Sequence, residues 1–185
     1  MKYLLFAGRF QPFHKGHLEA IKMILKKNKN NLIIGIVNPE PKNTVEFKEF
    51  SLEKNPFTFW ERYRMIRESL IDEKIDMKRI IIIPNYPSFI FGKEKNINFE
   101  PERNQVISHL NIVTDWDKEK IKIHEKEGYT YKTTNYVFKV KNAIVTASEV
   151  RRRIKNNGNW EELLPKAVVK IIKEVDGINR IKQTL

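Results

Sequence analysis

Short apolar runs alternate with amphipathic stretches along the first half of the chain. The runs at about 2–7, 32–37 and 79–84 have the length and composition of buried strands. Between the first two, apolar residues recur at helical spacing and predict a helix over about 15–28. Thr58 followed by Glu61 is the signature of a capping box and predicts the start of a second helix. This alternation predicts an α/β fold with a parallel sheet.

The second half of the chain holds shorter elements. We expect, in order, a fourth strand at 111–114, a helix at 117–126 closed by Gly128, strands at about 129–134 and 137–140, a helix that opens at 146 and ends at Gly158, and a last amphipathic helix at 163–175. Two stretches, 38–54 and 84–104, match neither period, and we interpret them as loops that can carry function. We expect a single domain over 1–185, with a helical C-terminal part from about 146 to 185.

Composition narrows the class of protein. The 185 residues contain no cysteine, which excludes disulfides and thiolate metal sites, and no apolar run approaches the roughly 20 residues that span a bilayer. No signal-peptide pattern opens the sequence, so a cytoplasmic protein without membrane contact is expected. The formal net charge of +12 favours polyanionic ligands. Because no nucleic-acid-binding module is recognisable, we expect small nucleotides rather than nucleic acid.

Candidate chemistry concentrates directly after the first predicted strand. A strand, a turn and a helix start over residues 3–18 direct free backbone N–H groups and the positive end of a helix to one place, which is a typical anion site. Arg9, His14, Lys15 and His17 lie in this turn. A metal site is a weaker interpretation, since the two histidines lack the glutamate and the third ligand of a zinc helix. A nucleotide phosphate is therefore the expected ligand.

Three segments resemble a known family. Gly-Arg-Phe-Gln-Pro-Phe-His-Lys-Gly-His, from Gly8 to His17, resembles the His-x-Gly-His motif of the nucleotidylyltransferase superfamily, in the form found in archaeal-type nicotinamide-nucleotide adenylyltransferases. Thr-Ala-Ser-Glu-Val-Arg, residues 146–151, resembles the family's Ser/Thr-x-Ser/Thr-x-x-Arg signature. Asn-Pro-Phe-Thr-Phe-Trp-Glu-Arg, residues 55–62, is similar to a segment of the archaeal branch. Ordinary helix capping remains the simpler alternative for the last two segments.

The resemblance implies a Rossmann-like, doubly wound parallel sheet with the active site at the C-terminal edges of strands 1 and 4. It implies catalytic functions for His14, His17 and Arg151. The residues implied in binding ATP are Gly8, Arg9, Phe10, Lys15, Gly16, Thr146, Ser148 and Arg151. Those implied in binding the acceptor are Thr58, Arg62 and Trp116, with Phe89 and Phe91 as further candidates for stacking.

The implied reaction is transfer of an adenylyl group from ATP to nicotinamide mononucleotide, forming NAD and pyrophosphate. A phosphate-monoester acceptor is already anionic at neutral pH, so positioned donors and positive charge suffice without a general base. Mg²⁺ would be held mainly by the substrate phosphates, and the family implies a homo-oligomer. Two alternatives stay open: another acceptor or donor (FMN-forming, phosphopantetheine or CTP-dependent), and a regulatory module that binds nucleotides without catalysis.

Overall fold

The computed structural model describes residues 2–38, 51–87, 99–113 and 115–183, with the side chains of Asp115 and Trp116 left aside. Its helices and strands are β1 (Tyr3–Gly8), α1 (Lys15–Lys27), β2 (Leu32–Val37), α2 (Phe59–Asp72), β3 (Ile80–Asn85), β4 (Val106–Asn111), α4 (Asp115–Lys126), β5 (Thr130–Thr134), β6 (Lys139–Val140), β7 (Ala143–Ile144), α5 (Ala147–Lys155), α6 (Lys166–Glu174) and α7 (Gly177–Gln183). Short 3₁₀ turns lie at Leu52–Lys54, Met77–Arg79, Arg103–Gln105 and Glu161–Leu163.

The chain divides into two compact units. The first, here called the sheet unit, comprises residues 1–8, 20–37 and 76–137. The second, here called the helical unit, comprises residues 9–19, 38–75 and 138–185. That the two units act as a single domain over 1–185 stays a prediction.

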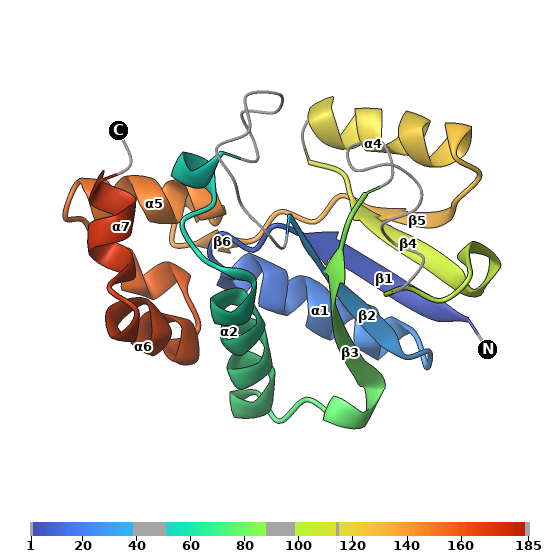
Figure 1. Ribbon diagram of the computed structural model, residues 1–185, viewed down its shortest axis with the longest axis horizontal. Coiled ribbons are helices and arrows are strands. Elements are labelled where there is room, and N and C mark those ends of the chain that lie inside the picture. Colours follow the sequence, from blue (N-terminus) through green and yellow to red (C-terminus); the bar gives the residue numbers. More distant parts are fainter. Residues whose placement is uncertain (1, 39–50, 88–98, 114, 184–185) are drawn as a thin grey trace. The chain divides into compact units, whose positions relative to one another are not determined.

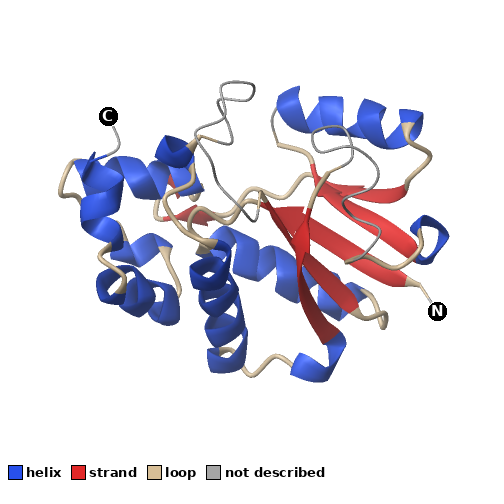
Figure 2. Cartoon of the chain, in the orientation of Figure 1, coloured by secondary structure: helices blue, strands red, loops and turns tan. Residues whose placement is uncertain are grey.

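The sheet unit is built on five parallel strands in the order β3-β2-β1-β4-β5. Figure 2 shows them as one layer, and Figure 1 shows α4 and α1 on either side of it. The order reverses direction between β2-β1 and β1-β4, so right-handed connections place the two helices on opposite faces. On one face Leu5, Ile33 and Val106 form a buried cluster. The predicted α/β fold with a parallel, Rossmann-like sheet is therefore confirmed.

Burial explains why the strands were predicted with unequal success. Every residue of β2 is buried, because β2 lies inside the sheet, and its bounds match the apolar run. The expectation that β3 is a buried strand was wrong, since β3 lies at the edge of the sheet and Ile81 is 38% exposed. The fourth strand was predicted too late in the chain. It runs over Val106–Asn111. The prediction missed this start because Ser108 and His109 interrupt the apolar pattern within the strand.

The helical unit collects α2, α5, α6, α7 and the first turn of α1. Helix α2 begins at the predicted capping box, and the strand predicted at 137–140 shortens to β6, which pairs with β7. The predicted last helix, 163–175, is divided: Leu163 ends a 3₁₀ turn, and Pro165 is the N-cap of α6. Asp176 takes a left-handed conformation with φ 56°, which ends that segment and lets the unpredicted α7 begin.

Candidate active site

Residues 8–17 form the first motif, and its two histidines cap helix α1. Strand β1 ends at Gly8, one residue beyond the predicted run, and the turn that follows leads to Lys15 at the start of α1. The His17 N–H lies 3.3 Å from Nδ1 of His14, and the His14 N–H lies 3.3 Å from Nδ1 of His17. This reciprocal arrangement is a capping box built from imidazoles instead of a hydroxyl and a carboxylate. The spacing of His14 and His17 therefore has a structural reason as well as the predicted catalytic one.

The same geometry sets the protonation of both rings. They are stacked, with centroids 3.5 Å apart and planes inclined by 21°. Because each Nδ1 accepts a hydrogen bond, each neutral ring carries its hydrogen on Nε2. Burial lowers the pKa of His14 to about 3, and burial together with the neighbouring His14 lowers the pKa of His17 well below its usual value. At neutral pH the pair therefore consists of uncharged N–H donors, without the positive charge that a protonated imidazole would add.

Gly16 brings residues 9–17, here called the histidine turn, close to residues 146–151, the second motif. A Cβ at this position would lie 3.1 Å from Cε1 and Nδ1 of His14 and 3.4 Å from the carbonyl oxygen of Val145. Val145 precedes Thr146, the N-cap of α5. The absence of a side chain at Gly16 thus allows the two motifs, far apart in sequence, to meet inside the helical unit.

Arg151 joins these motifs directly. Its guanidinium donates to the carbonyl oxygen of Gln11 at 2.5 Å and reaches Oγ of Ser148 at 3.4 Å. Burial and, to a smaller extent, the positive charge of Arg9 lower the pKa of Arg151 to about 10, while Glu53 acts in the opposite direction. Arg9 and Arg151 are therefore close enough to repel each other, which leaves a concentration of positive charge beside the histidine turn.

The neighbouring arginines of α5 are neutralised locally. Arg152 and Arg153 both donate to the carboxylate of Glu149, each at 2.8 Å. These bonds lower the pKa of Glu149 to about 2. Thr146 caps the helix by accepting the Glu149 N–H at 3.1 Å. Among the three consecutive arginines it is thus Arg151, the one singled out from the sequence, that contacts the histidine turn.

The third motif, residues 55–62, forms the predicted capping box at the start of α2. Thr58 Oγ1 accepts from the Glu61 N–H at 3.2 Å, and the Thr58 N–H donates to Glu61 Oε2 at 2.9 Å. The Glu61 carboxylate also pairs with the guanidinium of Arg180 at 2.9 and 3.0 Å, so its arginine partner is in α7. The side chain of Thr58 is therefore engaged in capping, and its proposed contact with the acceptor stays a prediction.

Arg62, the other acceptor candidate of this helix, is completely buried. Its guanidinium donates to the carbonyl oxygens of Thr58, Arg9 and Asn38 at 3.1, 2.9 and 2.7 Å. Burial lowers the pKa of Arg62 to about 9, with Glu61 opposing this effect and Arg9 adding to it. The geometry gives Arg62 a function in holding the backbone of the histidine turn, and its contact with an acceptor remains a prediction.

Other predicted site residues are placed less directly. Lys15 Nζ donates to the carbonyl oxygen of Glu162 at 2.8 Å. Gly8 is the last residue of β1 and belongs to the sheet unit. Phe89 and Phe91 lie outside the described residues, and so does the side chain of Trp116. Their proposed functions are untested.

Gln11 is the site residue that sequence reasoning missed. It is 2% exposed, and its side-chain amide forms two hydrogen bonds with the backbone of Phe57, while its carbonyl oxygen accepts from Arg151. Gln11 thereby contacts the third motif and the second motif at once. The available signal was a polar residue between Phe10 and Pro12-Phe13, where an apolar neighbourhood makes an uncharged amide conspicuous.

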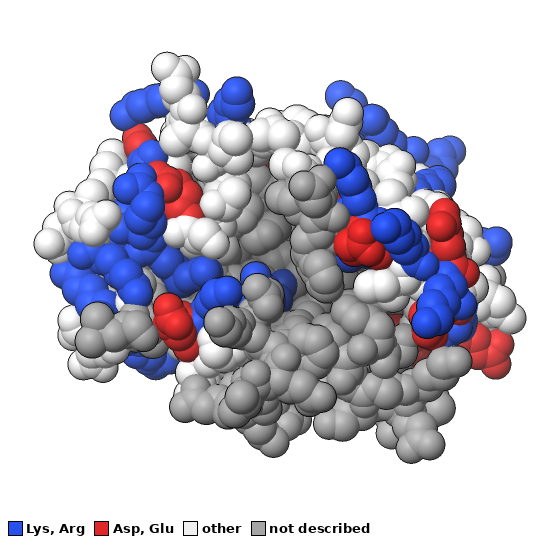
Figure 3. Space-filling model, turned by 90° about the horizontal axis from the view of Figure 1, so that it is seen from above, with Lys and Arg blue, Asp and Glu red and all other residues white. Residues whose placement is uncertain are grey.

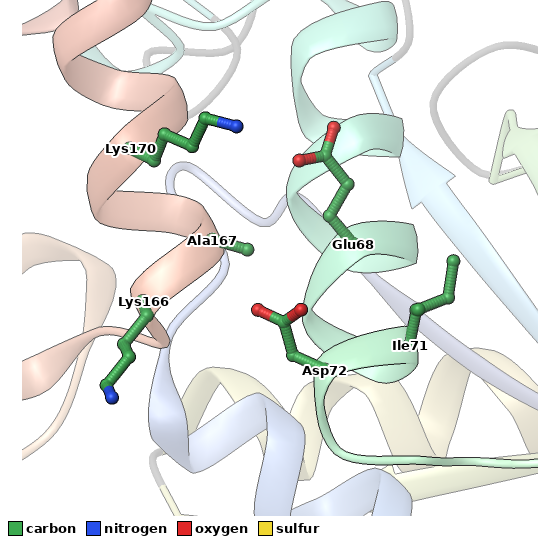
Figure 4. A pocket seen from close by; sticks show the side chains of 6 residues that line it. All are labelled: Glu68, Ile71, Asp72, Lys166, Ala167 and Lys170. Carbon is green, nitrogen blue, oxygen red and sulfur yellow. The ribbon is translucent and has the colours of Figure 1, made fainter.

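A groove in the helical unit does not suit a polyphosphate. It lies between α2 and α6, has a volume of about 390 Å³ and contains none of the predicted site residues (Figure 4). Its lining consists of Glu68, Ile71, Asp72, Lys166, Ala167 and Lys170. The carboxylates of Glu68 and Asp72 offset the charges of Lys166 and Lys170, so this lining offers no excess of positive charge to phosphate groups. In the described part of the chain no three His, Asp or Glu side chains gather into a metal site, and no helix of that part is long and apolar enough to cross a membrane.

Basic side chains extend well beyond the site. Figure 3 shows large groups of Lys and Arg side chains on the face that it draws, in keeping with the formal net charge of +12. Arg152 in α5 and Lys141 near β7 are among the exposed ones, with 63% and 78% of their side chains accessible. Such an excess of positive charge attracts polyanions over distances longer than a hydrogen bond.

Comparison with known proteins places this geometry in a family. The cytidylyltransferase-like family model matches residues 5–174. A nicotinamide-nucleotide adenylyltransferase of Pyrococcus horikoshii is 33% identical over 96% of this chain and 86% of its own length. The enzyme of the same name from Saccharolobus solfataricus is 34% identical over 97% of this chain and 94% of its own length.

Solved structures agree with these relatives. The bifunctional NMN adenylyltransferase/ADP ribose pyrophosphatase of Francisella tularensis matches with a TM-score of 0.67 and 25% identity over 95% of this chain. The chain spans about half the length of that protein, 50%. A structure of the bifunctional protein with AMP and a manganese ion matches with a TM-score of 0.64 at 22% identity, which speaks for the fold alone. The chain thus belongs to the cytidylyltransferase-like family and, within it, to the archaeal-type nicotinamide-nucleotide adenylyltransferases.

Proposed function

We propose that this protein transfers the adenylyl group of ATP to the phosphate of nicotinamide mononucleotide, forming NAD and releasing pyrophosphate. One observation carries the proposal beyond family membership. The uncharged His14 and His17 pair and the repelling guanidinium groups of Arg9 and Arg151 converge around one turn of the helical unit. A triphosphate would relieve the repulsion and accept hydrogen bonds from the pair.

The reaction follows from these groups. The acceptor phosphate, already anionic, attacks the α-phosphorus of ATP, the bond from the α-phosphorus to the bridging oxygen breaks, and pyrophosphate leaves with that electron pair. His14 and His17 would donate their Nε2 hydrogens to oxygens whose charge grows in the transition state, and Arg151 would stabilise the leaving pyrophosphate. No proton has to be removed from the acceptor, so the low pKa of His14 is compatible with catalysis.

The remaining contacts complete this proposal. Gly8, Arg9, Phe10, Lys15 and Gly16 would surround the phosphates from the first motif, and Thr146 and Ser148 from the second. Thr58, Arg62 and Trp116 are proposed on the acceptor side, with weaker support because Thr58 and Arg62 already make the contacts described above. We further propose that residues 1–185 act as one nucleotidyltransferase domain, since the family model extends across both units.

We propose Mg²⁺ as the metal that accompanies ATP. The described residues contain no cluster of three His, Asp or Glu ligands, which suits an ion coordinated mainly by phosphates and water. The ion would neutralise negative charge on the phosphates. A homo-oligomer in the cytoplasm is proposed on family resemblance.

Measuring pyrophosphate release tests the proposed function. Purified protein, Mg²⁺ and ATP are combined with nicotinamide mononucleotide, its nicotinic acid form, FMN or phosphopantetheine, and the product mass is read in each reaction. A parallel series contains CTP in place of ATP. NAD formation well above every other product supports the proposal, and a His17→Ala protein purified in the same way should be slower by about 10²-fold or more.

The other outcomes have distinct meanings. A different favoured product would keep the site and replace the acceptor or the donor. Nucleotide binding without pyrophosphate release from any mixture would contradict the enzymatic proposal and favour a nucleotide-binding regulatory module.

A further inference from the structure

The side chain of Gln11 joins the histidine turn to the start of helix α2. Nε2 donates to the carbonyl oxygen of Phe57 at 2.8 Å, and Oε1 accepts from the Phe57 N–H at 2.9 Å. Gln11 is 2% exposed and Phe57 is completely buried, so water does not compete for either bond. The amide of Gln11 therefore satisfies both backbone polar groups of one residue, Phe57, which is 46 positions away in sequence.

A second tie joins the same two segments. Arg62, one turn into α2, donates to the carbonyl oxygen of Arg9 at 2.9 Å. Arg9 and Gln11 flank Phe10, so the backbone is held on both sides of this residue. The start of α2 thus fixes the path of the chain through Phe10.

Phe10 requires such restraint. Its φ is 52°, in the left-handed region, which costs a non-glycine residue about 1–2 kcal/mol. A conformation of this kind persists where the surroundings determine it, and it recurs at functional sites. Because the flanking residues are held by Gln11 and Arg62, the surroundings here are the start of α2.

The position of Phe10 is transmitted to a proposed catalytic ring. The Phe10 ring is buried and meets the His17 imidazole edge to face, with centroids 4.9 Å apart and planes at 79°. On another side Phe13 stacks on His17 at 5.6 Å. A change in the backbone at Phe10 would therefore move the Phe10 ring, one of the two phenylalanine rings that contact the His17 imidazole.

We propose that Gln11 is a positioning residue of the transfer reaction, which acts by holding Phe10, and through Phe10 the imidazole of His17, against the start of α2. This inference rests on the proposed function for its catalytic part, whereas the effect on His17 exists in the protein without substrates. The alternative is that Gln11 only stabilises the fold. The two differ in whether loss of the amide changes His17 in protein that remains folded.

The test compares three variants in the full chain. Gln11→Met keeps the approximate size of the side chain and removes both bonds to Phe57. Arg62→Lys removes the fork that holds Arg9, and it serves as the second variant if Gln11→Met does not fold. Ser69→Ala is the matched control, since Ser69 is a completely buried polar residue of α2 whose hydroxyl donates only to the backbone oxygen of Met65 among the bonds described, at 2.6 Å.

Imidazole nitrogen NMR provides the readout that needs no catalysis. The chain has 4 histidines, so His109 and His124 in the sheet unit act as internal references. In Gln11→Met and Arg62→Lys we expect the ring signals of His17 to shift while those of the references stay. In Ser69→Ala all four should stay. Unchanged His17 signals in a folded Gln11→Met protein would overturn the proposal.

Steady-state kinetics tests the catalytic part. For Gln11→Met we expect kcat to fall about 10-fold to 10²-fold with the KM for ATP changed by less than about 3-fold, because a displaced donor weakens the transition state more than substrate binding. Ser69→Ala should keep both constants per folded molecule. Shifted His17 signals with wild-type kcat would also overturn the proposal. If wild-type protein forms no NAD at all, the proposed function fails, while the NMR comparison still decides whether Gln11 positions His17.

Discussion

Helices α1 and α2 both begin with a reciprocal capping box, but the two boxes leave opposite charge at the helix start. In α2 the box is Thr58 and Glu61, and the Glu61 carboxylate is itself paired with Arg180. In α1 the box is His14 and His17, and the first turn contains no acidic residue. The positive end of α2 is thus occupied by the protein's own anion, whereas the first turn of α1 has no acidic side chain, as the proposed phosphate ligand requires.

The difference shows how one local structure can serve either stability or binding. A carboxylate caps a helix and cancels its end charge at the same time. A neutral imidazole caps through Nδ1 and still carries a donor hydrogen on Nε2. Two histidines three positions apart are therefore compatible with a stable helix and with a phosphate ligand.

Giving α1 the acid of α2 should have the largest effect. In His17→Glu a carboxylate would lie where the phosphates are proposed to bind, so we expect turnover to fall by about 10³-fold. Glu61→Gln in α2 is the control, with an expected loss of stability on the order of 1 kcal/mol and turnover within about 3-fold. Steady-state kinetics and chemical unfolding of both variants measure these values. Wild-type turnover of His17→Glu would remove His17 from the mechanism.

The arginines of α5 sharpen the comparison at a third helix start. Arg151→Ala should lower kcat/KM for ATP by about 10²-fold, since its guanidinium reaches the histidine turn and is not neutralised by Glu149. Arg152→Ala, at the next position, removes an exposed ion pair and should change kcat/KM for ATP by less than about 2-fold. Titration with ATP and initial rates distinguish the two. Equal losses would assign the effect to general positive charge.

The close approach at Gly16 should matter less, but measurably. Gly16→Ala places a Cβ 3.1 Å from the His14 ring, and the resulting displacement should reduce turnover by about 10-fold. Gly158→Ala, where the added Cβ would find its nearest neighbour at 3.6 Å, serves as the control with near-wild-type rates. Initial rates and thermal melts of both proteins are the measurement. A Gly16→Ala enzyme as fast as wild type would show that the imidazole pair tolerates displacement.

The histidine box should also make the fold sensitive to acid, with the smallest effect of the series. The pKa of His14 is about 3 in the folded state and near 6.5 when unfolded, so below pH 6.5 the unfolded chain binds a proton that the folded chain does not. Stability is therefore lost as pH falls, by up to about 1.4 kcal/mol per pH unit for this group. The free energy of unfolding of wild type and His14→Gln is compared between pH 6.5 and 5. Parallel profiles would contradict a neutral buried His14.

How well the sequence predicted the fold depended on burial. The continuous apolar run 32–37 became β2 with those bounds because β2 is covered on both faces. The edge strand β3 and the polar residues of β4 lack that constraint, so burial and position were misjudged there. Helix α7 was missed because Gly177 begins it and few apolar residues repeat along its seven residues.

The candidate site was likewise predicted in part. Motif spacing identified His14, His17 and Arg151, and the structure brings these residues to one turn. The neutrality of the histidines and the functions of Gln11 and Arg62 depend on burial and on partners 46 and 53 positions away. Such pairings are a property of the tertiary fold, and no local pattern encodes them.

The three-part composition of the helical unit has a consequence for biosynthesis. Arg151 is 140 positions beyond Gln11, yet the two are hydrogen-bonded in the folded protein. Because the N-terminal part emerges from the ribosome first, the histidine turn is exposed long before α5 exists to cover it. The strands of the sheet unit up to β5 can pair during that interval, but the segment 138–185 must be translated before the helical unit is complete. The contact between Arg151 and Gln11 can therefore form only after α5 has been translated, so a ribosome that stalls before α5 leaves a nascent chain with a sheet and an incomplete helical unit.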